Sequence, residues 1–415
     1  MLSVEQALEK VLAQVSVLEA EEKPLLDALG QVLAEDAVAQ FPIPPLDNTA
    51  MDGYAVRAVD TESAAPESPV RLAVIGELAA GSVFGGDLRP GTAVRIMTGA
   101  PLPASADAVV PFEDTNEPEG REFGTFAKPV ESVAVRRSVR KGDNVRYAGE
   151  DIAAGKRIVA AGTVLRAAHV GALAAMGRAT VRVIRRPVIA VLSTGDELVP
   201  LGRPLGPGQI HDSNTYSVSA LVKESGGIPK TLGIAADNVE ALTARIREGL
   251  DADLLLTSAG VSRGDYDMVK DVLAREGEIA FWTVRMKPGK PLAFGTFARD
   301  GRRVPHIGFP GNPVSSMISF ELFARPAIFK MMGRSDWQRP TLRVTLEDAI
   351  ANRDGRRVFA RAIVRERDGR YYASLTGPQG SGVLTSMTIA NALVVVPEDT
   401  PQARPGDVLT AIMLG

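Results

Sequence analysis

Between residues 187 and 330, short apolar segments alternate with longer amphipathic ones. Six apolar runs have the length of strands, at residues 188–192, 231–234, 254–257, 279–284, 292–294 and 306–309. Four stretches have apolar residues at helical spacing, at residues 217–225, 239–249, 267–275 and 314–331. This alternation is typical of βαβ units, so it predicts a largely parallel sheet with helices on both faces. Functional loops are then expected at the carboxyl ends of the strands.

The segments before and after this region have other patterns. Residues 3–15 place their apolar side chains on one helical face, and Ser3 with Gln6 forms a capping box, so the pattern predicts an amphipathic helix. The proline-rich segment 41–46 excludes a helix and favours an extended connection. Short apolar runs between Gly and Pro residues predict a small all-β domain within residues 55–150, and strands again near the C-terminus.

The chain has 415 residues, no cysteine and three histidines. This length predicts two to four domains. The lack of cysteine excludes disulfides, a thiolate nucleophile and a cysteine zinc site, and three scattered histidines exclude a histidine-rich metal site. Catalysis therefore has to use carboxylates, Lys, Arg, Ser, Thr and backbone amides, or chemistry that the substrate brings.

Charge and hydropathy exclude further classes of protein. The net charge of −3 argues against a general nucleic-acid binder, which is normally basic. No apolar run approaches the length of a membrane span. Glu5, Glu9 and Lys10 lie within the apolar pattern of the N-terminal helix, so this segment is not a secretory signal. These features predict a cytoplasmic protein without nucleic-acid or membrane partners.

Two of the four loops that follow predicted strands are acidic. Residues 193–197 carry two adjacent carboxylates beside a glycine, and they suit contact with a metal or a hydroxyl, or form an ordinary acidic turn. Residues 257–267 combine small residues with Asp265 and Asp267 at the start of a predicted helix. Those carboxylates either cap the helix or bind magnesium or substrate, and the lack of a GxxxxGK[ST] pattern excludes a Walker loop.

The third loop, Lys-Pro-Gly-Lys-Pro at residues 287–291, is basic. Its Pro-Gly pair predicts a type II turn, which brings the Cα atoms of Lys287 and Lys290 within ~7 Å of each other. Two ammonium groups at that separation repel each other unless they are solvated or bridged by an anion. The loop is therefore either an oxyanion clamp or a solvated turn.

The fourth loop begins the last predicted helix of the α/β segment. Asn312 is the predicted N-cap and Pro313 the first helical residue. Ser315 and Ser316 then place hydroxyls beside unpaired amides, which makes an anion site or only a well-capped helix. Together the four loops predict one crevice with a cationic, amide-rich side and an acidic side. Such a crevice suits a phosphoryl- or nucleotidyl-bearing substrate with magnesium, and no thiol from the protein.

Six motifs occur in a fixed order along the chain: DNTAMDGYA (47–55), RIMTGA (95–100), STGDEL (193–198), GVSRGDYD (260–267), MKPGKP (286–291) and PGNPVS (310–315). This set resembles that of the molybdopterin molybdenumtransferases, which include the bacterial MoeA proteins and the E domain of gephyrin. The resemblance covers essentially the whole chain. It is specific because six motifs match in order, although each motif alone would be weak evidence.

The resemblance implies a multidomain α/β plus β fold and an elongated homodimer. The implied domains are a mixed α/β N-terminal domain at residues 1–40 and 150–180, a β-rich inserted domain at 41–149, a central molybdopterin-binding α/β domain at 181–330 and a C-terminal β-barrel domain at 331–415. The central domain is expected to have three layers and a mostly parallel sheet.

The resemblance also implies a reaction and its participants. Molybdenum from molybdate is inserted into adenylylated molybdopterin, and AMP is released in a step that depends on Mg²⁺. Molybdate and adenylylated molybdopterin are therefore the implied substrates, and Mg²⁺ is the implied cofactor. Molybdopterin adenylyltransferase and proteins that mature molybdoenzymes are the implied partners.

The matching motif positions imply the site residues. The implied catalytic residues are Asp267, Lys287, Lys290, Ser315 and Arg361, and the implied metal ligands are Asp267, Glu197 and Asp237. The substrate-binding positions are Asp52, Thr98, Thr194, Gly195, Asp196, Glu197, Asp237, Ser258, Gly260, Ser262, Asp265, Pro310, Gly311, Asn312 and Pro313. Asp52 and Thr98 match positions that complete the cleft, and the resemblance suggests that the other subunit supplies them.

Two positions depart from the family pattern. Ala259 stands where the family has glycine, which adds a methyl group to a segment of close backbone approach, and Thr283 stands where some relatives have lysine. Two other functions stay open: a molybdopterin adenylyltransferase, which uses a similar α/β domain, and a non-catalytic scaffold like gephyrin. ATP consumption would indicate the first, and a lack of AMP release with every metal would indicate the second.

Overall fold

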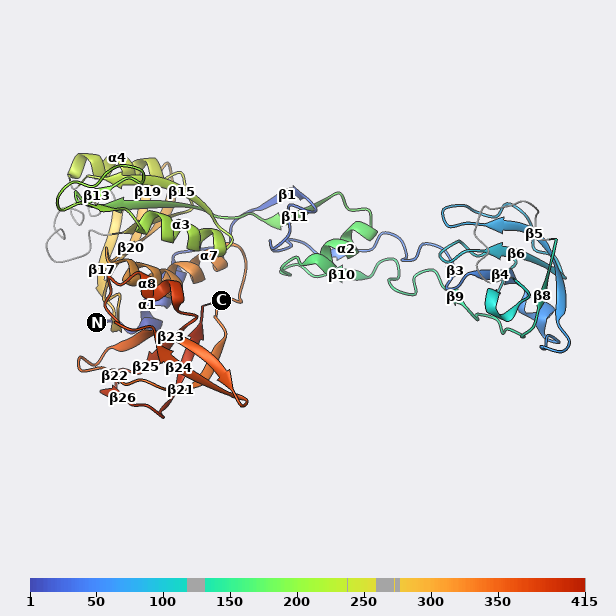
Figure 1. Ribbon diagram of the computed structural model, residues 1–415. Coiled ribbons are helices and arrows are strands. Elements are labelled where there is room, and N and C mark those ends of the chain that lie inside the picture. The colour runs from blue at the N-terminus through green and yellow to red at the C-terminus, as the bar shows by residue number, and fades with distance from the viewer. Residues whose placement is uncertain (118–130, 237, 259–271, 273–276, 415) are drawn as a thin grey trace. The chain divides into compact units, whose positions relative to one another are not determined.

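The structure is a computed structural model that describes residues 1–117, 131–236, 238–258, 272 and 277–414. The chain forms two compact units, each described separately below (Figure 1). The first unit comprises Met1–Lys23, Gly30–Ala34 and Arg182–Gly415, and the second comprises Pro24–Leu29 and Glu35–Val181. In the described part of the chain, no helix has both the length and the apolar character needed to cross a membrane.

A six-stranded sheet forms the centre of the first unit. Its strand order is β15 (Ile228–Ala235), β12 (Val188–Thr194), β16 (Leu254–Ser258), β20 (Arg302–Phe309), β19 (Pro291–Arg299) and β17 (Gly277–Thr283). The first four strands pair in parallel, whereas β19 pairs antiparallel with both β20 and β17. The predicted largely parallel sheet is therefore confirmed, with an antiparallel edge.

Helices cover both faces of this sheet. On one face α3 (Asn214–Glu224) and α6 (Pro313–Ser319) pack against alternate strand residues such as Val191 and Leu256. On the opposite face α4 (Val239–Gly249) packs against the residues in between. Figure 1 shows α4 on one side of the sheet and α3 on the other. This three-layer arrangement follows because the central strands β12 and β16 are buried on both faces and need cover on both.

The helix predicted at the N-terminus is present, whereas the last helix predicted in the α/β segment is divided into three parts. Helix α1 (Val4–Ala13) begins at the predicted Ser3–Gln6 capping box and packs its apolar face into the core of this unit. The stretch predicted as one helix at 314–331 consists of α6, a π-helical segment η3 (Phe320–Ala324) and α7 (Arg325–Met331). Pro326 explains the break, because proline lacks the amide that an uninterrupted α-helix needs at this place.

The last part of the first unit is a closed five-stranded barrel. Its strands pair in the cyclic order β23 (Arg357–Arg367), β24 (Arg370–Leu375), β21 (Thr341–Leu346), β27 (Val408–Met413) and β25 (Ala392–Val396), which pairs again with β23. The interior is filled by small and β-branched side chains. The remaining elements here are β18 (Met286–Lys287), which pairs with β23, and β22 (Ile350–Ala351), β26 (Gln402–Ala403) and α8 (Thr385–Ile389).

The second unit contains the predicted small β domain. Its five-stranded sheet has the order β7 (Ala108–Pro111), β4 (Gly53–Val56), β6 (Thr92–Ile96), β5 (Val70–Leu78) and β8 (Ser132–Val135). Short strand pairs join β3 (Asn48–Thr49) to β9 (Val145–Arg146) and β2 (Ala37–Val38) to β10 (Arg157–Val159). The other elements are α2 (Ala167–Ala175) and the 3₁₀ turns η1 (Ala58–Thr61) and η2 (Phe112–Asp114), while β1 (Ala20–Pro24) and β11 (Thr180–Ile184) lie where the chain passes between the units.

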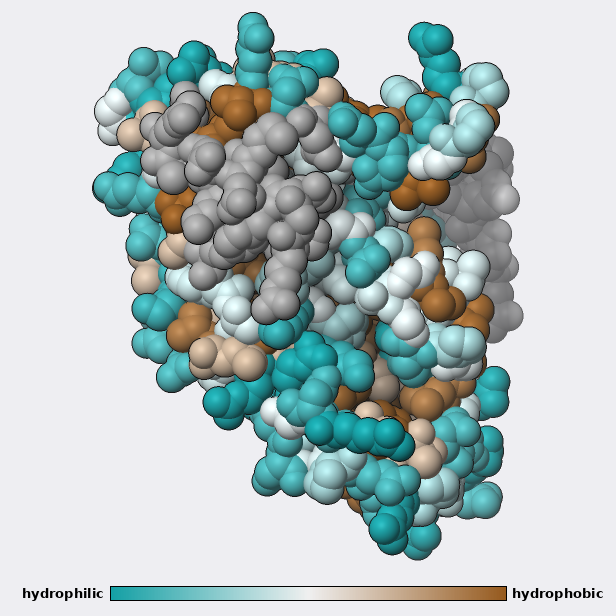
Figure 2. Space-filling view, turned by 90° about the vertical axis from the view of Figure 1, so that its left-hand side faces the viewer, coloured by the Kyte–Doolittle hydropathy of each residue, from teal (hydrophilic) through white to brown (hydrophobic). Residues whose placement is uncertain are grey.

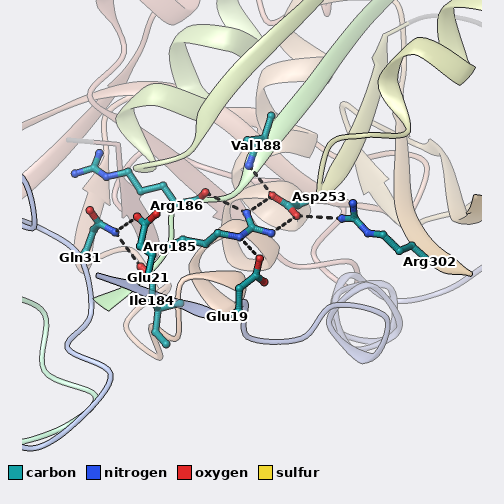
Figure 3. A network of polar contacts seen from close by, with 9 residues as sticks. All are labelled: Glu19, Glu21, Gln31, Ile184, Arg185, Arg186, Val188, Asp253 and Arg302. Atoms are coloured by element: carbon teal, nitrogen blue, oxygen red, sulfur yellow. Dashed lines mark hydrogen bonds and ion pairs between the residues drawn. The ribbon is translucent and has the colours of Figure 1, made fainter. Parts of the chain in front are cut away.

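An ion-pair network centred on the buried Asp253 joins the N-terminal segment of the first unit to its central sheet (Figure 3). Arg185 donates two hydrogen bonds of 2.6 Å from Nη1 and Nη2 to the two carboxylate oxygens of Asp253, and its Nε donates to Glu19 at 2.6 Å. The Val188 amide also donates to Asp253, at 2.8 Å. The carboxylate of Asp253 raises the pKa of the Arg185 guanidinium. The guanidinium and the carboxylate pair through two parallel hydrogen bonds, and Asp253 also binds the amide of Val188. Together these contacts hold the start of β12 in place.

Candidate functional site

The carboxyl ends of three neighbouring parallel strands meet at one edge of the central sheet. Ser193, Ser258 and Phe309 are register partners across β12, β16 and β20. A cavity of about 780 Å³ lies beyond this edge. Its lining residues are Thr194, Glu197, Leu198, Ile210–Asn214, Ser258, Lys287–Pro291, Pro310–Pro313, Ser315, Arg356 and Gln379–Gly382. The structure thus brings residues of all four predicted loops to one cavity, and among the described residues the second loop contributes Ser258.

The basic loop forms one wall of this cavity. Both Lys287 and Lys290 line it, and both side chains are exposed. The Nζ atom of Lys287 lies 4.0 Å from Oδ2 of Asp354. Gly289 has a φ of +96°, the positive value that the predicted turn requires, but the Lys287–Pro288 peptide bond is cis. The loop therefore differs from the all-trans type II turn that the Pro-Gly pair predicted.

Gly289→Ala is expected to disturb this basic loop. A Cβ atom at residue 289 would lie 2.8 Å from Cε of Met286 and 2.9 Å from Oγ of Ser319, in addition to the unfavourable positive φ. We expect destabilisation of about 1–2 kcal/mol, and a raised KM for an oxyanion bound by the predicted clamp of Lys287 and Lys290. The matched control is Gly301→Ala, because Gly301 has φ +77° with nothing within 4 Å of its Cβ position. Equal losses of stability and an unchanged KM in both variants would contradict this.

The start of α6 forms the neighbouring wall. Asn312 occupies the predicted N-cap position and Pro313 the first helical position, but the Asn312 side chain makes no capping hydrogen bond. Ser315 is only 3% exposed and still lines the cavity. The amide of Val314 donates to the carbonyl of Ser381 at 3.1 Å, so this helix start is tied to a loop of the barrel.

The acidic wall comes from the loop after β12. The carboxylate of Glu197 lies over Gly195, where a Cβ atom would be only 2.6–2.8 Å from the Glu197 carboxyl group. Glu197 lines the cavity, whereas Gly195 and Asp196 do not. No group of three or more His, Asp or Glu side chains is close enough to hold a metal in the described part of the chain. Among the described residues, Glu197 is thus a single carboxylate on this wall. A single carboxylate is compatible with Mg²⁺, because proteins usually hold this ion by one or two carboxylates together with substrate phosphates.

Five predicted site residues lie outside the described residues: Asp237, Gly260, Ser262, Asp265 and Asp267. They include two of the three implied metal ligands. Their roles stay predictions from the sequence.

The sequence analysis missed two buried polar residues at the sheet edge, Asn214 and Asp212, which with Ser258 form the polar floor of the cavity. Asn214 is 9% exposed, and its Nδ2 donates at 2.6 Å to both Oγ of Ser258 and the carbonyl of Gly311. Asp212 is 3% exposed and accepts from Ser193 and from the amide of Thr215. The predicted helix began at residue 217, whereas α3 begins at Asn214. The signal was present, because Asp-Ser-Asn is a run of residues that favour helix starts.

A loop of the barrel contributes residues that the sequence analysis also missed. Gln379, Gly380, Ser381 and Gly382 line the cavity together with Arg356. Arg356 pairs with Asp354, and this contact is the main cause that lowers the pKa of Asp354. The only local signal was the small, glycine-containing run itself. Nothing in the sequence shows that it returns to the sheet edge, which depends on the closure of the barrel.

Arg361 was predicted to be catalytic, and the structure places it behind this barrel loop. It is 1% exposed and does not line the main cavity. Its Nη1 donates to the carbonyl of Gln379 at 3.1 Å, and Nη2 donates to those of Pro378 at 3.3 Å and Gly380 at 2.9 Å. Burial lowers the pKa of this guanidinium. The Arg361 side chain therefore contacts the barrel loop, and residues 379–382 of that loop line the cavity.

Asp52 and Thr98 belong to the second unit. The amide and the hydroxyl of Thr98 both donate to Oδ1 of Asp52 at 2.6 Å. The hydrogen bond from the hydroxyl is the main cause that lowers the pKa of Asp52. The structure thus brings these two predicted residues together, 46 positions apart in the chain.

Known sequence families match three successive segments, which together cover most of the chain. Residues 2–177 match the MoeA N-terminal region (domain I and II), residues 190–330 match a probable molybdopterin binding domain, and residues 343–414 match the MoeA C-terminal region (domain IV). A molybdopterin molybdenumtransferase 2 from Mycobacterium tuberculosis is 40% identical over 390 residues, which cover 92% of each chain. The chain belongs to the MoeA family.

Further relatives within the MoeA family agree with this assignment. A molybdopterin molybdenumtransferase from Nostoc sp. is 38% identical over 89% of this chain and 83% of its own. The crystal structure of a molybdopterin biosynthesis moea protein from Pyrococcus horikosii is 32% identical, covers 100% of this chain and 99% of its own, and has a TM-score of 0.83. The multidomain α/β plus β fold that the motifs implied is thereby confirmed.

Proposed function

We propose that this chain inserts molybdenum from molybdate into adenylylated molybdopterin, with magnesium-dependent release of AMP. As a member of the MoeA family it is an enzyme of molybdenum cofactor biosynthesis, of the molybdopterin molybdenumtransferase type. The observation that carries the finer proposal is the cavity at the sheet edge, which has Lys287 and Lys290 on one wall and Glu197 on another. Molybdate is an oxyanion, which the lysines can bind directly, whereas a carboxylate such as Glu197 contacts a phosphoanhydride through Mg²⁺.

The residues act on this reaction through electrostatics. Lys287, Lys290 and the hydroxyl of Ser315 bind the oxygen atoms of molybdate, since ammonium and hydroxyl groups donate to oxyanions. Glu197 holds Mg²⁺, together with Asp237 and Asp267 from outside the described residues. When bound, Mg²⁺ supplies Lewis-acid stabilisation of charge on the phosphoanhydride. The buried floor of Asn214 and Ser258 orients the substrate from below.

The decisive experiment measures AMP. Purified protein is incubated with adenylylated molybdopterin, Mg²⁺ and molybdate, and AMP release is followed with and without molybdate and with a chelator. We expect release that needs both molybdate and the divalent cation. Consumption of ATP with molybdopterin would instead indicate an adenylyltransferase, and a lack of release with every metal would leave only a scaffold role.

We further propose that the active form is a homodimer in which Asp52 and Thr98 complete the site of the other subunit. Support comes from their hydrogen-bonded pairing within two motifs that match the family. Molybdopterin adenylyltransferase as a partner, and the cytoplasm as location, stay predictions from the sequence.

Subunit mixing tests this arrangement. Asp52→Ala and Lys287→Ala homodimers are each expected to be nearly inactive. Mixed and re-equilibrated at a 1:1 ratio, they should regain about a quarter of wild-type activity, because half of the dimers then carry one intact site. No regain, with heterodimers demonstrated by mass, would show that Asp52 acts within its own subunit. An active Asp52→Ala homodimer would show that Asp52 does not act at all.

A further inference from the structure

Two cationic side chains on the cavity wall share one carboxylate oxygen. Lys287 and Arg356 both line the cavity, whereas Asp354 does not. The Nζ atom of Lys287 lies 4.0 Å from Oδ2 of Asp354, and Nη2 of Arg356 donates a hydrogen bond to the same oxygen atom. Among the described residues, neither cation pairs with another carboxylate. Oδ2 of Asp354 therefore lies between two cations, where an oxygen atom of a bound oxyanion would also be stabilised.

The pairing of two distant segments brings these three residues together. Lys287 ends β18, which pairs in parallel with the start of β23, and Asp354 and Arg356 lie in the turn just before β23. The buried Asn352 anchors this turn, since its amide donates to the carbonyl of Pro401 at 2.8 Å. The Asp354 side chain itself is 40% exposed, so its position depends on its cationic partners more than on packing.

The contact of Asp354 with these cations is weak enough for a substrate to displace. At 4.0 Å the Lys287 ammonium group makes an ion pair with Asp354 but no hydrogen bond, and water screens exposed pairs of this kind. The hydrogen bond from Arg356 is the main cause that lowers the pKa of Asp354, and the charge of Lys287 lowers it further, so the carboxylate is ionised at neutral pH. An oxyanion that approaches the two cations has to compete with this negative charge.

We propose that Asp354 sets the affinity of the cavity for oxyanions, as an internal counter-ion that competes with the bound anion for Lys287 and Arg356. The proposal rests on the proposed function, because molybdate is the oxyanion that the reaction supplies. A residue that only oriented Arg356 toward the cavity would have the opposite effect, since its loss would weaken anion binding. The direction of the change in affinity therefore distinguishes the two roles.

Asp354→Asn tests the competition, because asparagine keeps the shape of the side chain and loses its charge. We expect the Kd for molybdate alone, measured by calorimetry on the full-length protein at low ionic strength, to fall about threefold to fivefold, the effect of one unit charge about 4 Å away at a solvated site. The KM for molybdate in AMP release should fall in parallel. The difference from wild type should shrink at about 0.5 M salt, because salt screens exposed charges.

The matched control is Asp336→Asn. Asp336 also pairs with an arginine two residues away, Arg334, at 2.7 Å, and it is exposed, but it does not line the cavity. Its loss changes the net charge equally, and the Kd for molybdate should stay at the wild-type value. Asp354→Ala, which removes the carboxylate altogether, should lower the Kd in the same direction as Asp354→Asn.

Three results would overturn the role of Asp354. They are an unchanged or raised Kd in Asp354→Asn, an equal fall of the Kd in Asp336→Asn, and undetectable binding of molybdate to wild type and both Asp354 variants. Failure of wild type to release AMP would remove the proposed function, while the comparison of molybdate Kd values would still decide whether Asp354 competes with the anion.

Discussion

Lys287→Ala is expected to lower kcat/KM for molybdate in AMP release by about 100-fold, the usual cost of removing one preorganised donor to an oxyanion. Lys287 lines the cavity on a loop next to the sheet edge, and its nearest carboxylate among the described residues, Asp354, lies 4.0 Å away and is paired with Arg356. Its ammonium group is therefore available to an incoming anion. Binding of the pterin substrate should persist, because the acidic wall and the polar floor are unchanged.

The measurement is AMP release over a range of molybdate concentrations, with pterin binding followed separately. Lys223→Ala is a matched control, because Lys223 lies at the exposed end of α3 and does not line the cavity, yet its loss changes the net charge equally. Lys287→Arg should recover part of the loss, since it restores the charge. An unchanged rate at limiting molybdate in Lys287→Ala would refute the clamp.

Asp253→Ala is expected to lower the free energy of unfolding of the first unit by about 3 kcal/mol. The Asp253 side chain is 6% exposed and receives three hydrogen bonds, two from Arg185 and one from the amide of Val188. Its removal leaves a largely buried guanidinium with Glu19 as its remaining ion-pair partner and leaves a main-chain amide unsatisfied. Breaking a buried pair on one side costs more than the pair contributes, because the remaining charge stays desolvated.

Tryptophan fluorescence during urea unfolding measures this effect selectively. Both tryptophans of the chain, Trp282 and Trp337, lie in the first unit, so the signal reports on that unit. The control is Glu248→Ala, which removes an exposed ion pair with Arg245 on α4 and should cost less than about 0.5 kcal/mol. Similar midpoints for the two variants would show that the Asp253 network contributes no more than a surface pair.

The surface of the first unit mixes hydrophilic and hydrophobic residues on the face shown in Figure 2. On this face, teal hydrophilic residues surround small separate groups of brown hydrophobic ones. Isolated exposed apolar residues are normal for a protein surface and carry no functional meaning by themselves. The polar side chains on which the proposed function depends, such as those of Ser315 and Asn214, line the cavity at the sheet edge.

Elements with strong local signals were predicted closely from the sequence. Helix α4 spans Val239–Gly249 as predicted, and α1 begins at its predicted capping box, because periodicity and capping are properties of adjacent residues. The start of α3 was predicted three residues late, since polar capping residues carry no periodicity. The cis bond before Pro288 was also missed, because the residues of a Pro-Gly turn do not determine the isomer of the preceding bond.

By itself, the sequence determined the alternating α/β order, the β character of the flanking parts and the loops that carry charge, because these follow from residue type and short-range spacing. Only the tertiary structure decided which loops meet. The parallel register of β12, β16 and β20 aligns the ends of three distant segments, and closure of the barrel returns Gln379–Gly382 to the same cavity. It also decided that Arg361 holds a loop, because the partners of a buried side chain depend on long-range packing and cannot be read from its neighbours in the chain.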